Sequence, residues 1–298
     1  MTAAKAYLYN EVNRLRALSL AEPKGRRQMS ETTTPSYTSI ADLTVALDDG
    51  VLALTLNRPD SLNSLTAPMF EAITDAVQRA GEDPAVRVVR IGGAGRGFSS
   101  GAGIGAAERS GPEAMTPGDV LLAANRAIKA IVALPKPVVS VVHGPAAGIG
   151  VSLAIAADIV LASEEAYFLL AFTKIGLMPD GGASVLVAAS IGRTKAMRLA
   201  LLAERLPAAD ALAAGLVSAV HPAAELEAEV DKVLATLKSG PAVALRRTKH
   251  AINAATLTEL DAAIDRETEG QLALLESDDL REGMRAFQER RPAKFTDA

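Results

Sequence analysis

The segment "HGPAAGIGVSLAIAAD", residues 143–158, lies within a run, residues 137–157, that contains no Lys, Arg, Asp or Glu. A membrane-spanning helix needs about 20 apolar residues in succession, and this run nearly reaches that length. However, Gly144 and Pro145 interrupt its middle, and each of two further glycines lowers helix propensity by about 1 kcal/mol relative to alanine. We therefore expect a strand, a turn and a helix that starts near Ile149 rather than a membrane span.

The segments on both sides of this turn predict alternating strands and helices. Residues 43–56 alternate apolar and polar positions around an Asp-Gly pair, which is typical of a hairpin. A helix capped by Thr66, a strand over 86–93 and a helix over roughly 117–133 follow. This repetition of strand, glycine-rich turn and helix indicates stacked β/α units, and hence an α/β fold with a mostly parallel sheet.

The pattern divides the chain into three parts. Residues 37–222 hold the predicted strands, whereas residues 223–298 show helical periodicity. Residues 1–36 are basic but lack the continuous apolar core of a secretory signal, so we expect a flexible N-terminal extension. A transit peptide, which this segment weakly resembles, and a start codon placed upstream of Met29 are the alternatives.

The composition excludes several classes of function. The 298-residue chain has a formal net charge of -4, and nucleic-acid binding instead needs a clustered basic surface. With no cysteine it has no disulfide and no thiolate nucleophile, so a reducing cytoplasm is the expected location. His143, His221 and His250 lack the spacing of metal ligands, so we expect no metal site.

Two glycine-rich loops follow predicted strands: the quoted turn and "FSSGAGIG", residues 98–105. The first turn of a helix presents unpaired N–H groups and positive potential, and glycine lets a ligand approach the backbone. Neither loop has the pattern of a phosphate-binding motif. Such loops are also ordinary connections, so the loops alone leave both interpretations open.

Seven segments, in this order along the chain, match the sequence motifs of one protein family. They are "LNRPDSLNSLT", "GRGFSSGAGI", "LPKPVVSVVHGPAAGIG", "KIGLMPDGGAS", "ADALAAGLV", "SGPAVALRRTK" and "SDDLREGMRAFQERRPAKF". From about Tyr37 to Phe295 the chain resembles the crotonase (enoyl-CoA hydratase/isomerase) superfamily. The resemblance implies a crotonase-like spiral of ββα units over residues 37–222 and a helical C-terminal oligomerisation region, which in the family forms trimers, over residues 223–298.

The resemblance also implies a chemistry. In the family, an acyl-CoA thioester carbonyl accepts hydrogen bonds from two backbone N–H groups, which stabilise an enolate. By motif position these would be the amides of Ala102, after Ser100 and Gly101, and of Ile149, after Gly148. Coenzyme A then enters as part of the substrate, and no separate cofactor is expected.

Departures from the family pattern reduce the number of reactions that the resemblance allows. The two positions that carry glutamates in the family's hydratases fall on Ser152 and Phe172. Asp180 remains, at the position where one isomerase branch carries its catalytic carboxylate, and one base suffices to move a proton from the α to the γ carbon. A pocket lined by Phe172 and Met178 would raise the pKa of that carboxyl. The resemblance thus implies a Δ3,Δ2-enoyl-CoA isomerase.

Alternatives remain open at this stage. Asp180 is also favoured simply as a turn residue, and a hydratase, another crotonase chemistry such as ring opening or hydrolysis, or a non-catalytic acyl-CoA-binding member would fit the same motifs. Lys249, Phe287 and Arg290 match positions where relatives approach the CoA nucleotide, sometimes from a neighbouring subunit. The expected partners are therefore an acyl-CoA thioester and further copies of the chain, as a homotrimer or a dimer of trimers.

Overall fold

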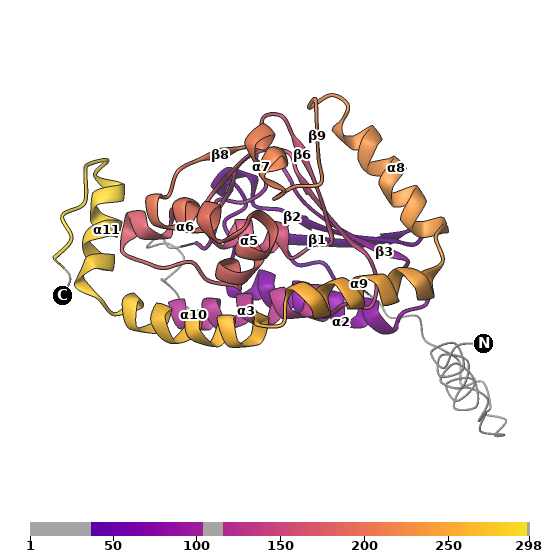
Figure 1. The fold of residues 1–298 in the computed structure, drawn as a ribbon, viewed down its shortest axis with the longest axis horizontal. Coiled ribbons are helices and arrows are strands. Elements are labelled where there is room, and N and C mark those ends of the chain that lie inside the picture. Colours follow the sequence, from indigo (N-terminus) through magenta and orange to yellow (C-terminus); the bar gives the residue numbers. More distant parts are fainter. Residues whose placement is uncertain (1–36, 104–115, 297–298) are drawn as a thin grey trace, which may run out of the picture. The chain divides into compact units, whose positions relative to one another are not determined.

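The computed structural model describes residues 37–103 and 116–296. Its main sheet has six strands in the order β1-β2-β3-β4-β6-β9, and a smaller sheet joins β5, β7 and β8. In the main sheet only β1 and β2 pair antiparallel. Figure 1 shows the arrangement. The strand bounds are β1 Leu43–Asp48, β2 Val51–Leu56, β3 Val88–Gly93, β4 Val138–Val142, β5 Ala146–Ala147, β6 Ile159–Ser163, β7 Tyr167–Leu169, β8 Leu206–Pro207 and β9 Ala219–His221.

The predicted hairpin over residues 43–56 is confirmed. Asp49 and Gly50 form its turn, and both have positive φ, at 41° and 78°. Two consecutive residues with positive φ define the turn type whose twist matches that of the flanking strands. The alternating apolar residues of both strands face the core, since Leu43, Leu52 and Leu54 are all completely buried.

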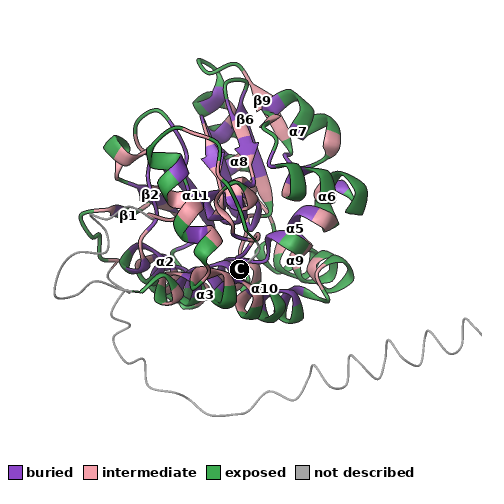
Figure 2. Ribbon diagram, turned by 90° about the vertical axis from the view of Figure 1, so that its left-hand side faces the viewer, coloured by how far each residue is buried: buried purple, intermediate pink, exposed green. Residues whose placement is uncertain are grey.

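Helices pack on both faces of the main sheet, and on one of the faces they cover only some of its strands. The bounds are α2 Ala67–Glu82, α3 Pro117–Ala133, α4 Ile149–Ile155, α5 Ala183–Ile191, α6 Arg193–Leu202, α7 Ala208–Ala214, α8 Leu226–Ser239, α9 Ala242–Thr256, α10 Leu260–Leu275 and α11 Asp278–Gln288, with short 3-10 turns η1 Pro59–Ser61 and η3 Ala171–Ile175. Helices α2 and α3 pack against each other, and α10 packs on α3. On the opposite face, α8 buries Leu226, Val230 and Leu234 against β3, β4 and β6. The second face is therefore covered over β3, β4 and β6, whereas Thr44 and Ala46 of β1 are exposed. In Figure 2, buried residues gather on strands such as β6, and the surrounding helices carry exposed residues.

The uncharged segment that opened the sequence analysis folds as expected. All five residues of β4 are buried, and α4 begins at Ile149 with all seven of its residues buried. Within the described residues, no helix is long and apolar enough to cross a membrane. The missing charges therefore reflect a strand and a helix that both lie in the core.

After β9 the described chain has helices joined by short connections, and no further strand. Strand β9 ends at His221, and α8 to α11 follow. The expected division at residue 222 lies close to this change, but the domain roles assigned to residues 37–222 and 223–298 stay predictions. The flexible extension expected over residues 1–36 lies outside the described residues.

Helix α9 has no fully buried residue and is held by polar contacts. Lys249 Nζ lies 2.9 Å from Asp158 Oδ2, and the Lys249 side chain is only 9% exposed. The same ammonium donates to the carbonyl oxygens of Ile131 and Lys136, both at 3.2 Å. One turn later, Asn253 Nδ2 donates to the carbonyl oxygen of Val132. Lys249 therefore fixes α9 to the connection between α3 and β4, and to the end of α4.

We expect Lys249→Met to lower the free energy of unfolding by about 2 to 3 kcal/mol, because hydrogen bonds to a charged group are lost and Asp158 keeps an unpaired charge. Denaturant unfolding measures the change. Lys232→Met is the matched control, since that lysine is 69% exposed in its pair with Glu229 and should cost less than about 1 kcal/mol. Equal losses in the two variants would contradict the anchoring role.

Candidate active site

A cavity of about 690 Å³ lies between the two glycine-rich loops, α3 and the C-terminal helices. The predicted site residues that line it are Ser100, Gly101, Ala102, Gly148, Ile149, Phe172, Asp180 and Phe287. Apolar side chains of α3, α10 and α11 line it as well, among them Leu121, Leu275, Leu280 and Met284. The cavity therefore combines a polar backbone region with a long apolar wall.

The two glycine-rich loops pair with each other through their backbones. Ser99 and Ala146 form a parallel bridge, and the Ala147 N–H donates to the Ser99 carbonyl oxygen at 2.9 Å. Gly101 has a φ of +96°, and a Cβ there would lie 2.9 Å from the carbonyl oxygen of Ala147. A Cβ on Gly150 would lie 2.8 Å from Ser99 Cβ. Side chains at these glycines would therefore push the loops apart.

This pairing leaves two backbone donors free at the cavity. Leu65 N–H donates to the Gly101 carbonyl and Gly103 N–H donates to the Leu65 carbonyl, so the Ala102 N–H between them faces the other way. Ile149 is the first residue of α4, where an N–H has no partner within the helix. Neither amide has an acceptor within residues 37–103 and 116–296. Both residues line the cavity, so two unpaired N–H groups are available to one ligand oxygen.

Asp180 is the buried acidic residue of the cavity lining. Its residue exposure is 8%, and its carboxyl oxygen Oδ2 accepts a hydrogen bond from Gln271 Nε2 at 2.8 Å. The other oxygen, Oδ1, is shielded from water and has no partner among the described residues. Burial raises the pKa of Asp180 to about 7, the hydrogen bond from Gln271 opposes this rise, and the charge of Glu267 adds to it. The carboxyl can thus take up and release a proton near neutral pH.

The loop that carries Asp180 is fixed from two sides. Ser152 Oγ on α4 donates to the backbone carbonyl of Asp180 at 2.8 Å. From α10, the Glu267 carboxylate accepts from the Gly182 N–H at 2.6 Å and from the Ser184 N–H at 2.8 Å. Burial raises the pKa of Glu267, while its hydrogen bonds to Ser184 and Gly182 favour the ionised form. A carboxylate at this place also suits the N-terminus of α5.

Sequence reasoning missed Glu267 and Gln271, which are 1% and 2% exposed. A signal was present: they stand four residues apart on α10, on the same face as the buried Leu260, Ala263 and Ile264. A glutamate and a glutamine within an apolar stripe indicate buried polar partners.

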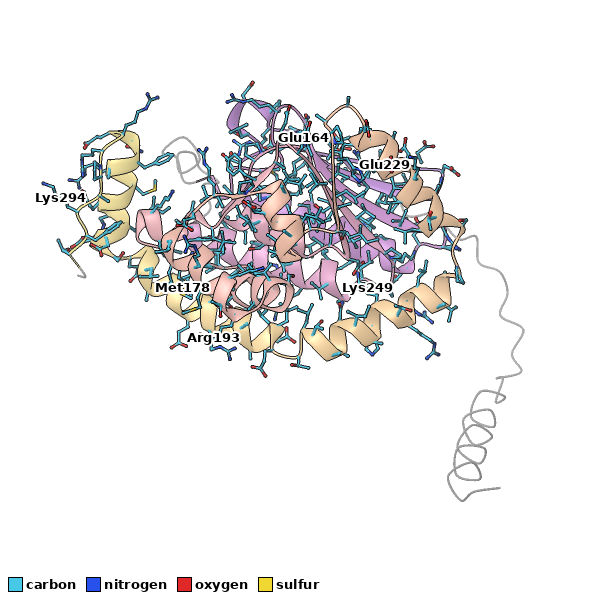
Figure 3. The ribbon with its side chains drawn as sticks, turned by 45° about the horizontal axis from the view of Figure 1, so that its top comes forward. Glu164, Met178, Arg193, Glu229, Lys249 and Lys294 are labelled. Carbon is cyan, nitrogen blue, oxygen red and sulfur yellow. The ribbon has the colours of Figure 1, made fainter. Side chains whose placement is uncertain are left out.

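Three predicted binding residues lie elsewhere. Lys249 is not in the cavity lining, and its ammonium pairs with Asp158. Figure 3 shows it well apart from Met178, which lies two residues before Asp180. Met178 does not line the cavity either: its sulfur packs on Gly270 and its N–H donates to Gln271, while Leu177 lines the cavity instead. Arg290 follows α11 with a φ of 53° and is also outside the lining.

A metal site would need acidic and imidazole side chains of the described residues to gather in one place. Within residues 37–103 and 116–296, no three His, Asp or Glu side chains lie close enough together to hold an ion.

Comparison with known proteins establishes the family. The model of the enoyl-CoA hydratase/isomerase family matches residues 46–298, and the chain belongs to this family. A probable enoyl-CoA hydratase of Rhodobacter capsulatus is 37% identical over 252 residues, covering 84% of this chain and 96% of that protein. The 1,2-epoxyphenylacetyl-CoA isomerase of Escherichia coli is 36% identical with the same coverage.

A solved structure agrees with the fold. The crystal structure of an enoyl-CoA hydratase from Mycobacterium avium subsp. paratuberculosis superposes with a TM-score of 0.81 at 64% identity, covering 87% of this chain and 100% of that one. The crotonase fold expected from the sequence is thereby confirmed. Because the relatives are named for both hydratase and isomerase reactions, the choice between these reactions depends on the site.

We expect Asp180→Asn to be more stable than the wild type at high pH. With its pKa at about 7 in the folded state and about 3.9 when unfolded, Asp180 binds a proton more readily in the folded chain. Its contribution to stability is complete below about pH 4 and is lost as pH rises through 7. Denaturant unfolding should therefore show the advantage of the variant growing by about 2 to 3 kcal/mol between pH 5 and 8. Parallel stability curves would contradict the assigned burial.

Proposed function

We propose that this protein is a Δ3,Δ2-enoyl-CoA isomerase, which shifts a β,γ double bond of an acyl-CoA thioester to the α,β position. The observation that carries the proposal is the single buried carboxyl, Asp180, in a cavity that also offers the unpaired amides of Ala102 and Ile149. The other acidic residue in the described lining, Asp42, lies 3.5 Å from Arg58 and has a side chain that is 41% exposed.

The proposed reaction begins with the thioester carbonyl. Its oxygen accepts hydrogen bonds from the Ala102 and Ile149 N–H groups, which stabilise the negative charge that develops there. The Asp180 carboxylate removes a proton from the α carbon, and the electron pair of that C–H bond moves into a dienolate. Asp180 then returns the proton to the γ carbon while the electrons reform the carbonyl and leave an α,β double bond. No atom is gained or lost, and one residue serves as base and then as acid.

The pKa of Asp180 suits this double role. A general base works best when its pKa lies near the working pH, because both the ionised and the protonated form are then accessible. Burial raises the pKa of Asp180 to about 7, whereas an ordinary aspartate near 3.9 would be a weak base.

The cavity gives less support to a hydratase. Adding water needs one group to activate the water and another to deliver a proton. Ser152 is completely buried and its hydroxyl donates to the Asp180 backbone, and Phe172 supplies only an apolar wall. Hydratase activity remains the second candidate because relatives such as the one from Rhodobacter capsulatus are named probable enoyl-CoA hydratases. Other crotonase chemistry, and acyl-CoA binding without turnover, are the remaining alternatives.

The remaining expectations about partners belong to the same proposal. Coenzyme A enters as part of the substrate, with no separate cofactor, and Phe287 is proposed to contact it. This assignment is supported by Phe287 lining the cavity with 73% of its surface exposed. Self-association as a homotrimer or a dimer of trimers is supported by exposed apolar side chains such as Leu201, Leu202 and Ile252. A cytoplasmic location stays a prediction.

Incubation with a 3-enoyl-CoA tests the reaction, with ultraviolet absorbance reporting the conjugated 2-enoyl thioester. We expect turnover by the wild type and a loss of about 100-fold to 10,000-fold in kcat for Asp180→Asn, since general acid and base catalysis contributes this much. Binding of the saturated thioester should change little in that variant. Undiminished turnover by Asp180→Asn would exclude the base, a 3-hydroxyacyl product from 2-enoyl-CoA would favour hydration, and binding without turnover would favour a non-catalytic member.

A further inference from the structure

Helix α10 contacts Asp180 through one uncharged side chain, and this contact has a fixed direction. Gln271 Nε2 donates to Asp180 Oδ2 at 2.8 Å, and Gln271 Oε1 accepts from the Met178 N–H at 3.1 Å. If the amide turned over, its NH₂ group would face the Met178 donor and its oxygen would face the carboxylate, so both contacts would become repulsive. The backbone of Met178 therefore fixes the glutamine as a donor to Asp180.

Nothing else among the described residues holds the Asp180 carboxyl group in place. Its second oxygen, Oδ1, is without a partner there, and Ser152 contacts only the backbone carbonyl of Asp180. Without Gln271, the carboxyl would be free to rotate about its terminal torsion, which has a broad energy minimum. Gln271 is 2% exposed, so water does not readily replace its N–H.

We propose that Gln271 is a positioning residue of the active site, which holds the plane of the Asp180 carboxyl toward the substrate through Oδ2 and favours its ionised form. This inference rests on the proposed function, because it concerns the base of that reaction. Gln271 also lines the cavity, and the proposed role is exerted through the Asp180 carboxyl rather than on the substrate. Its role depends on its donor group, so that a side chain of equal size without a donor should not replace it.

Glu267, which also lies on α10, shifts the pKa of Asp180 in the direction opposite to Gln271. The charge of Glu267 raises the pKa of Asp180, whereas the hydrogen bond from Gln271 lowers it. Arg266 lowers the pKa of Glu267 and so favours its ionised form. From α4 the loop is contacted by the uncharged Ser152, and the other charged residues of the described cavity lining are Asp42, Lys174 and Arg205. Replacing the two α10 residues should therefore shift the titration of Asp180 in opposite directions.

The test compares Gln271→Met and Glu267→Gln by the pH dependence of kcat/KM with a 3-enoyl-CoA. In Gln271→Met the acidic limb should move to higher pH by about half to one unit, the size expected for one lost hydrogen bond. Its kcat at pH 7 should fall roughly tenfold with little change in KM, because the base is less ionised and less well oriented. In Glu267→Gln the limb should move to lower pH.

Thr268→Val is the matched control. Thr268 also lies on α10. Its hydroxyl accepts from Asn125 Nδ2 at 2.8 Å and donates to the Ile264 carbonyl, so among the described residues neither hydrogen bond involves Asp180. This variant should lose stability and keep the wild-type acidic limb. If Gln271→Met has the same limb and the same ratio of kcat to KM as Thr268→Val, the positioning role is overturned.

A measurement without turnover separates this inference from the proposed function. The pH dependence of thermal unfolding is compared between Gln271→Met and the double variant with Asp180→Asn, and between the wild type and Asp180→Asn. In each pair, the variant that keeps Asp180 should lose stability relative to its Asp180→Asn partner as pH rises through the pKa of Asp180. This loss should continue to higher pH when residue 271 is methionine than when it is glutamine. That shift supports the inference even if 3-enoyl-CoA is not turned over, and identical windows overturn it even if the isomerase reaction is confirmed.

Discussion

The pairing of the two glycine-rich loops is the constraint on which the site depends. A thioester oxygen can meet two amides only if both backbones approach one point, and the bridge between Ser99 and Ala146 brings them together. Gly101 and Gly150 allow this approach because their missing Cβ atoms would collide with the opposite loop. The loops extend from β3 and β4, which are neighbouring parallel strands of the main sheet, so the sheet order itself delivers both donors to one edge.

The Asp180 carboxyl is the second part of the candidate site. Only one of its two oxygens has a hydrogen-bond partner among the described residues. A buried carboxylate with one unpartnered oxygen costs free energy, and this cost appears as a pKa raised to about 7. The C-terminal helical region limits that cost through Gln271 and also fixes the loop through Glu267. A region for which the family resemblance implies oligomerisation thus also helps to build the candidate site of its own chain.

Much of this arrangement could be predicted from the sequence, and the reasons are local. The hairpin, the Thr66 cap and the start of α4 at Ile149 follow from short patterns, since turns and caps depend on a few neighbouring residues. The family motifs correctly named the residues of both loops that line the cavity. Gln271 could not be found in this way, because its contact joins residues 91 positions apart in the chain. The ion pair of Lys249 could not be predicted for a related reason: a lysine in a motif gives no sign that Asp158 pairs with it.

The central claim is that one buried carboxyl carries a proton from the α to the γ carbon. The most direct measurement is a single turnover of 3-enoyl-CoA deuterated at C2, with the position of deuterium in the product read by mass spectrometry or NMR. Because Asp180 is 8% exposed and one of its oxygens is shielded from water, we expect a measurable fraction of the deuterium at C4 of the 2-enoyl product. A product whose new hydrogen at C4 comes only from solvent would contradict the account.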